Sequence, residues 1–222
     1  MPIILAWRIY QQGNAAQKLE VSSRYAAIKT IADYLLNNSA RVDGLKKESG
    51  PWTHQERWEE VSGFSPSTLA AEIAGLVCAA DLAIINGDKV NAARYLKAAD
   101  QWQQLLNRWT FTTNGPLKDR GIGNGRYFLR ISENKDPNGA DSKTYGNGGG
   151  VHDERDIVDG GFLELVRLGV RRALSDDILD TIPEYDAVLK QTIGGDEAWF
   201  RYNFDGYGET NAGENYTDDA AN

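Results

Sequence analysis

The stretch that decides the fold reads PSTLAAEIAGLVCAADLAII over residues 66–85. Its apolar residues recur at the 3.6-residue spacing of one helix face: Leu69, Ile73, Leu76 and Ala80. Ser65 stands before the stretch as an N-cap, and Pro66 suits the first helical position. We therefore predict a helix here that stops near Asn86-Gly87, where a glycine can end it.

A second helix is predicted directly after this glycine, with Asp88 as its N-cap. Its apolar face reads Ala92, Leu96, Ala99, Trp102, Leu106 and Trp109. The two tryptophans lie on this face, so we expect them to pack in the core. The two helices together predict an antiparallel helical hairpin.

Outward from this hairpin, the same periodicity predicts four more helices: residues 2–12, about 23–37, a short one at 162–169, and one capped at 175–177 that runs to 189, with Pro183 kinking its first turns. Long connections fill 41–64, 110–160 and 194 onward. Connections of this length usually carry function. The stretch 126–131 has strand character and predicts a small β-hairpin. The fold class is therefore all-α, built of stacked helical hairpins.

Composition limits the classes of function. The 222 residues suffice for one domain with a sizeable core, and 41% of them are hydrophobic. The formal net charge of -8 offers no broad positive field, so we expect no nucleic-acid partner. We find no signal sequence and no run that approaches the ~18 apolar residues of a membrane span, and expect no membrane partner. Cys78, the single cysteine, is read as core filler.

Aromatic and acidic residues are densest in Trp52-Thr53-His54-Gln55-Glu56-Arg57-Trp58-Glu59-Glu60. A sugar site needs aromatic faces against pyranose C–H groups and carboxyl groups that bind hydroxyls or move protons. The adjacent carboxylates Glu59 and Glu60 should repel each other, which raises one pKa and keeps a proton available. The alternative is that the glutamates are solvated and pair with Arg57.

The segment from Glu56 to Thr68, which reads ERWEEVSGFSPST, resembles the acid-bearing segment of glycoside hydrolase family 15, the glucoamylases and glucodextranases. Further segments resemble this family in the same order: PIILAW at 2–7, DIVDGGFLELVRLG at 156–169, RYN at 201–203 and DGYGE at 205–209. The resemblance spans essentially the whole chain and is nearest to the bacterial type. It implies part of an (α/α)6 toroid whose loops form a pocket at one end.

The resemblance also implies roles for individual residues. Glu59 would be the general acid that protonates a glucosidic oxygen, and Glu60 would bind the sugar beyond the scissile bond. Trp58 would shape the same subsite, and Arg57 is a further candidate for substrate binding. Arg201 and Asp205 would contact glucose hydroxyls, with a structural role at the pocket rim as the alternative. The implied substrates are α-glucans such as starch, maltooligosaccharides or dextran.

This sequence departs from the family pattern in one important way. The family's glutamate base and an early sugar-binding Arg-Asp pair have no match between Met1 and Asn222. We therefore expect residues 1–222 to form one partial catalytic domain, truncated at both ends, and expect apolar faces that promote self-association. The mechanism implied is inverting hydrolysis. The alternative is a catalytically incomplete, carbohydrate-binding or assembly-dependent fragment. The family alone suggests an extracellular or periplasmic location.

Metals and nucleotides receive little support from the sequence, and we expect no cofactor. His54 and His152, the two histidines, are far apart, and no strand-turn-helix context surrounds the loop glycines. Asp136-Pro137-Asn138-Gly139-Ala140-Asp141 is read as a turn, with a structural calcium site as the alternative. The charged run 153–156 is read as a solvated cluster, with Arg155 a weak candidate for contact with the pocket.

Overall fold

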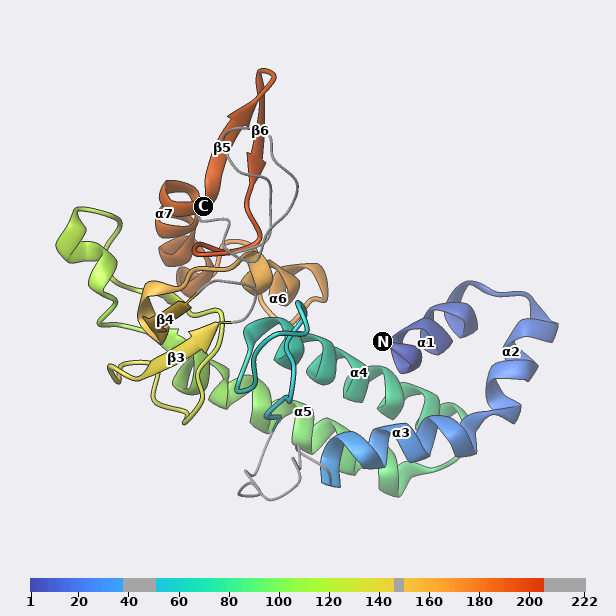
Figure 1. Ribbon diagram of the computed structural model, residues 1–222. Coiled ribbons are helices and arrows are strands. Elements are labelled where there is room, and N and C mark those ends of the chain that lie inside the picture. The colour runs from blue at the N-terminus through green and yellow to red at the C-terminus, as the bar shows by residue number, and fades with distance from the viewer. Residues whose placement is uncertain (38–50, 146–149, 206–222) are drawn as a thin grey trace.

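The computed structural model describes residues 1–37, 51–145 and 150–205 (Figure 1). Its α-helices within these ranges are α1 (Pro2–Gln12), α2 (Ala15–Ser23), α3 (Tyr25–Asn37), α4 (Pro66–Ile85), α5 (Lys89–Thr110), α6 (Leu163–Arg167) and α7 (Asp176–Leu189). The predicted all-α class is confirmed. Residues 206–209 of the DGYGE segment lie outside the described residues.

The central hairpin is formed by α4 and α5, which run side by side through the middle of the molecule (Figure 1). The side chain of Asp88 accepts a hydrogen bond from the backbone N–H of Asn91 at 3.1 Å, as an N-cap does. Gly87 takes a φ of 79°, a left-handed conformation that glycine adopts without steric cost. The predicted hairpin is therefore confirmed, and Trp102 and Trp109 are buried in its core.

The N-terminal third contains a helix that the periodicity of apolar residues does not predict. This helix, α2, buries only Val21, so it carries little amphipathic signal. Asn14 and Gln17 form a reciprocal capping box. The Gln17 N–H donates to the Asn14 side chain at 3.0 Å, and the Asn14 N–H donates to the Gln17 side chain at 2.9 Å. The capping pattern, rather than periodicity, was the available signal. The helix expected from about residue 23 begins at Tyr25.

The described residues form three two-stranded antiparallel sheets that lie beside the helices. They pair β1 (Phe111–Thr112) with β2 (Tyr127–Phe128), β3 (Ser142–Tyr145) with β4 (Gly150–Asp153), and β5 (Lys190–Ile193) with β6 (Asp196–Trp199). The stretch 126–131 does contain a strand, but its partner lies at the end of α5 instead of in a tight hairpin. The β5–β6 hairpin was not expected, although its two-residue Gly194-Gly195 turn is a strong hairpin signal.

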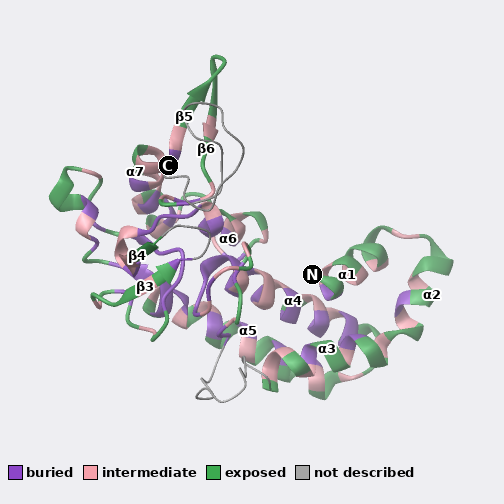
Figure 2. Ribbon diagram, in the orientation of Figure 1, coloured by how far each residue is buried: buried purple, intermediate pink, exposed green. Residues whose placement is uncertain are grey.

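The core has one large cluster along α4 and α5 and two smaller ones under the loops (Figure 2). One of the smaller clusters contains Val61, Ile131, Tyr145, Ile157 and Tyr202, and Trp58 packs against it. These residues come from segments far apart in sequence. This small core therefore joins the 51–64 loop to the segments around Ile131, Tyr145, Ile157 and Tyr202.

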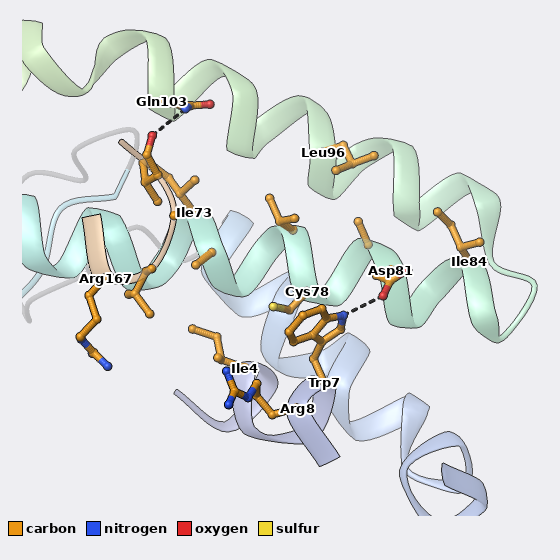
Figure 3. A pocket seen from close by; sticks show the side chains of 16 residues that line it. Ile4, Trp7, Arg8, Ile73, Cys78, Asp81, Ile84, Leu96, Gln103 and Arg167 are labelled. Carbon is orange, nitrogen blue, oxygen red and sulfur yellow. Dashed lines mark hydrogen bonds between the residues drawn. The ribbon is translucent and has the colours of Figure 1, made fainter. Parts of the chain in front are cut away.

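The helix α4 corrects the expectation that no segment has the length and apolarity of a membrane span. It is 20 residues long, and an 18-residue window within it has a mean hydropathy of 1.9. In this fold, α4 packs against α1, α3, α5 and α6, which is the environment of a core helix. On one side of α4, a groove of about 580 Å³ lies between α1 and α5, where Trp7 Nε1 donates to Asp81 at 2.7 Å (Figure 3).

Candidate functional site

The 51–64 loop carries the candidate acid on a tight turn just before α4. The loop is tied at its base by bridges between Thr53 and Gly63 and between Phe64 and Ser132. Within it, the N–H of Glu59 donates to the carbonyl of Glu56 at 2.9 Å. Glu59 has a φ of 62°, in the left-handed region that a residue with a Cβ seldom adopts. The turn directs the Glu59 side chain to solvent, where the residue is exposed.

The neighbouring glutamates have a different environment, because both are paired with a buried arginine. Arg130 is 1% exposed, and its Nη2 donates to Glu56 Oε1 at 2.7 Å and to Glu60 Oε2 at 2.6 Å. Burial alone would lower the pKa of Arg130, but the two carboxylates raise it above its ordinary value. The alternative in which these glutamates are solvated and pair with Arg57 is therefore wrong for Glu56 and Glu60.

Tyr202 completes the surroundings of Glu60. Its hydroxyl donates to Glu60 Oε2 at 2.5 Å, and the Arg130 guanidinium lies 3.6 Å from the centre of its ring. Burial and this hydrogen bond raise the pKa of the Tyr202 hydroxyl, so it remains a donor. Glu60 therefore has a cation and a hydroxyl on the same carboxylate, which balances its charge inside the protein.

Trp58 is fixed through its indole N–H. The Nε1 atom donates to Asp159 Oδ2 at 2.5 Å, and Asp159 is only 5% exposed. Burial raises the pKa of Asp159 to about 6, while the bond from Trp58 and the charge of Arg130 act in the opposite direction. The guanidinium groups of Arg57 and Arg201 lie 4.5 and 5.0 Å from the indole ring centre.

Arg201 and Asp205 join the same site from the other end of the chain. Their side chains form an ion pair, with Arg201 Nε 2.5 Å from Asp205 Oδ2, and Arg201 Nη2 lies 3.7 Å from Glu60 Oε1. The described residues bring the candidates for the acid and for substrate binding together: these contacts link Arg57, Trp58, Glu60, Arg201 and Asp205, and Glu59 lies between Trp58 and Glu60 in the turn. They come from two segments about 140 residues apart.

Three residues of the site, Arg130, Asp159 and Tyr202, were not named as candidates by sequence reasoning. The signal for Arg130 was its place in the apolar run Tyr127-Phe128-Leu129-Arg130-Ile131, because a charge buried among such neighbours needs an anionic partner. Asp159 offered a weaker signal, since an acidic residue before two glycines is also common in turns. The partners of these residues could not be read from the sequence.

A hollow of about 480 Å³ lies beside the turn. It is lined by residues 55–58 of the loop, by the first turns of α4, and by Glu164 and Arg167 of α6. Glu59 and Glu60 are not among the residues that line it. The described residues therefore place an exposed carboxylate next to an aromatic ring and several fixed charges, a set of groups suited to polar, uncharged ligands rich in hydroxyls.

The remaining candidates make local contacts. His54 packs edge-on against Trp52, and His152 stacks on Phe204 with ring centres 4.0 Å apart. Asp136 accepts the Gly139 N–H in a turn, and no group of three His, Cys, Asp or Glu side chains suited to a metal occurs among the described residues. Arg155 pairs with Asp153 at 2.7 Å.

Comparisons with known proteins agree on one family. A family model described as Glycosyl hydrolases family 15 matches residues 9–217. A glucoamylase from Clostridium sp. (strain G0005) is 40% identical over 215 residues, which are 97% of this chain and 27% of that protein. A crystal structure of a bacterial glucoamylase complexed with acarbose matches with a TM-score of 0.82 and 41% identity, over 97% of this chain and 28% of that one. The chain thus spans little more than a quarter of the length of these relatives.

Proposed function

Because this chain belongs to glycosyl hydrolases family 15 and its fold is part of an (α/α)6 toroid, we propose that Glu59 is the general acid of an exo-acting α-glucosidase. In this role, Glu59 protonates the glucosidic oxygen as the bond to the leaving sugar breaks. The substrates are the non-reducing ends of starch-, maltooligosaccharide- or dextran-type glucans. The acarbose in the complex of the related bacterial glucoamylase supports a glucan ligand.

The observation that carries this proposal is the contrast between Glu59 and its neighbours. Glu56 and Glu60 are buried and committed to Arg130, whereas Glu59 is exposed on a turn held on both sides. A carboxyl group that donates a proton to a ligand must reach that ligand without breaking a structural ion pair. Among the three glutamates of the turn, Glu59 meets this requirement.

The proposed substrate contacts follow from the same geometry. The Trp58 indole, fixed by Asp159, offers an apolar surface beside the acid. Arg201, whose side chain is 31% exposed, presents a charged group that binds sugar hydroxyls, while the buried carboxylates of Glu60 and Asp205 orient it. Arg57 lies at the edge of this surface. Fixed groups of this kind bind a sugar with little loss of side-chain entropy.

The proposed mechanism is inverting hydrolysis. Glu59 donates its proton on one face of the glucosidic bond, and a carboxylate base activates water on the other, about 6.5 to 9.5 Å from the acid. We assign no base among the described residues. A second candidate function is therefore a carbohydrate-binding unit that hydrolyses glucans only when assembled with further elements, which is favoured by the 27% share of the related glucoamylase that the chain spans.

The test is glucose release from maltooligosaccharides and isomaltooligosaccharides by the 222-residue chain and by Glu59→Gln. We expect the substitution to lower the rate by about 100-fold or more, since general acids typically contribute about 10²–10⁴. Glu20→Gln, at a glutamate in α2 whose side chain is 59% exposed, is the matched control and should keep the full rate.

The two candidate functions give different results in this experiment. Hydrolysis that depends on Glu59 supports the α-glucosidase, and hydrolysis that survives Glu59→Gln contradicts the role of this residue. Binding of acarbose without glucose release, measured by calorimetry, supports the assembly-dependent unit. If the chain neither binds acarbose nor hydrolyses glucans, both candidates are contradicted.

A further inference from the structure

Arg130 is buried beside the turn that carries Glu59. Its neighbours Leu129 and Ile131 are buried, and its own backbone N–H donates to the carbonyl of Ile157 at 3.3 Å. The N–H of Leu129 donates to the carbonyl of Thr110 at the end of α5, at 2.9 Å. The guanidinium is therefore attached to the central hairpin through a short, well-fixed segment.

From this position, Arg130 reaches both sides of Glu59. Its bond to Glu60 fixes the residue that follows Glu59, and its bond to Glu56 fixes the residue three positions before. Glu56 in turn bonds to the backbone of the turn. Its Oε2 accepts the N–H of Trp58 at 2.9 Å, and its backbone carbonyl accepts the N–H of Glu59 at 2.9 Å. Both of these bonds end at the backbone next to the exposed carboxylate.

The turn needs these bonds, because the backbone at Glu59 is in an unfavourable conformation. A residue with a Cβ at a φ of 62° is less stable than in the right-handed region, so the surroundings must compensate. Without the arginine, the buried carboxylates of Glu56 and Glu60 would face each other unbalanced. Charge-assisted bonds from a planar guanidinium are the strong kind of hydrogen bond that can stabilise such a turn.

We propose that Arg130 is a positioning residue for the acid: it fixes the conformation of Glu59 through Glu56 and Glu60 without touching the substrate. This inference rests on the proposed role of Glu59. It extends that role by assigning a function to a buried residue about 70 positions away in the sequence. Arg130→Lys keeps the positive charge, but its ammonium falls one bond short of the Nη2 atom that donates to both carboxylates, so the turn should loosen while the fold remains.

The experiment measures amide hydrogen exchange by NMR in the 222-residue chain and in Arg130→Lys. We expect protection of the Glu59 amide to fall at least about tenfold, while the amides of Leu76 and Leu106 in the central hairpin keep theirs. Arg126→Lys is the matched control, because Arg126 belongs to the same segment but pairs with Asp180 at the surface. Arg126→Lys should leave the protection of the Glu59, Leu76 and Leu106 amides unchanged.

Kinetics on the same proteins separate positioning from general destabilisation. Where the chain releases glucose, Arg130→Lys should lower kcat at least about tenfold and change KM by less than about twofold, as expected when an acid is misplaced. Unchanged Glu59 protection in Arg130→Lys overturns the inference, as does a uniform loss of protection across the central hairpin.

The hydrogen-exchange test of Arg130 does not depend on glucan binding or hydrolysis. If Arg130→Lys does not fold, Glu56→Gln tests the same path, since it removes one charged acceptor and should reduce protection at Trp58 and Glu59 but not at Leu76 and Leu106. If the chain neither binds nor hydrolyses glucans, the proposed function fails, and the exchange result still decides whether Arg130 holds the turn.

Discussion

Glu59 and Glu60 are adjacent in the sequence but lie in opposite environments. From the sequence we expected the two carboxylates to repel each other. That expectation assumes that adjacent side chains point the same way. The left-handed backbone at Glu59 instead directs this side chain to solvent, while the Glu60 side chain is 4% exposed and paired with Arg130. The environments of two neighbouring carboxylates therefore depend on backbone conformation and on distant partners, neither of which spacing reveals.

Glu154 corrects the interpretation of residues 153–156 as a solvated cluster. It is 2% exposed, and its oxygens accept the N–H of Glu133 at 3.1 and 3.2 Å. Burial raises the pKa of Glu154 to about 7, although the bond from Glu133 acts in the opposite direction. The folded protein thus holds a proton here that the unfolded chain releases near pH 4.5.

We predict that this proton makes stability depend on pH. Because the folded pKa is raised, the free energy of unfolding should fall as pH rises from about 4.5 to about 7, by up to about 3 kcal/mol. Glu154→Gln cannot titrate and should lack this part of the decrease. Urea unfolding at several pH values measures it, and Glu20→Gln should behave like the parent chain. Equal pH slopes in Glu154→Gln and the parent would contradict the prediction.

At the scale of elements, the ends of the long helices were predicted well. The helices α1, α4, α5 and α7 have the predicted bounds to within a residue or so, because Pro2 and Pro66 at helix starts, the Asp88 cap and the glycines just after helix ends are local signals. Ser65 and Ser175, expected to cap α4 and α7, make no side-chain cap bond. The strands were predicted poorly, since a two-residue strand such as β2 exists only through its partner β1. The short hairpins depend on where the surrounding loops pack.

The Asp88 cap should contribute measurably to the central hairpin. Asp88→Ala removes the acceptor for the Asn91 N–H and for the Tyr25 hydroxyl, 2.9 Å away, so we expect a lower free energy of unfolding, measured with urea. Asp100→Ala, at an exposed position of the same helix, is the control and should change stability by less than about 0.5 kcal/mol. A similar loss in both variants would show that the cap has no special role.

At the scale of the whole molecule, the helices α1–α3 form an arc with many exposed residues (Figure 2). A groove of about 700 Å³ between these helices is lined mostly by apolar residues. Leu5 and Ile9, which line it, are 57% and 48% exposed. The groove shown in Figure 3 adds a second apolar surface along α4. Contiguous apolar patches of this kind favour association in water.

We therefore predict that the chain self-associates as its concentration rises. The combined substitution Leu5→Lys and Ile9→Lys should shift the protein toward monomer, because burying two ammonium groups opposes association. Size-exclusion chromatography with light scattering measures the mass. Leu174→Lys is the control, since Leu174 is 81% exposed but lies outside both grooves. A monomer at every concentration for the parent chain would contradict the prediction.

The sequence by itself determined the helical class, the bounds of the central hairpin and the segment that carries Glu59, because periodicity, caps and motifs are local properties. Only the tertiary structure decided that Arg130 and Asp159 hold this segment, and that Glu60 is buried while Glu59 is exposed. These features join residues 70 to 142 positions apart. The sequence shows that a buried charge needs a partner, but only the packing of the elements decides which partner lies within hydrogen-bonding distance.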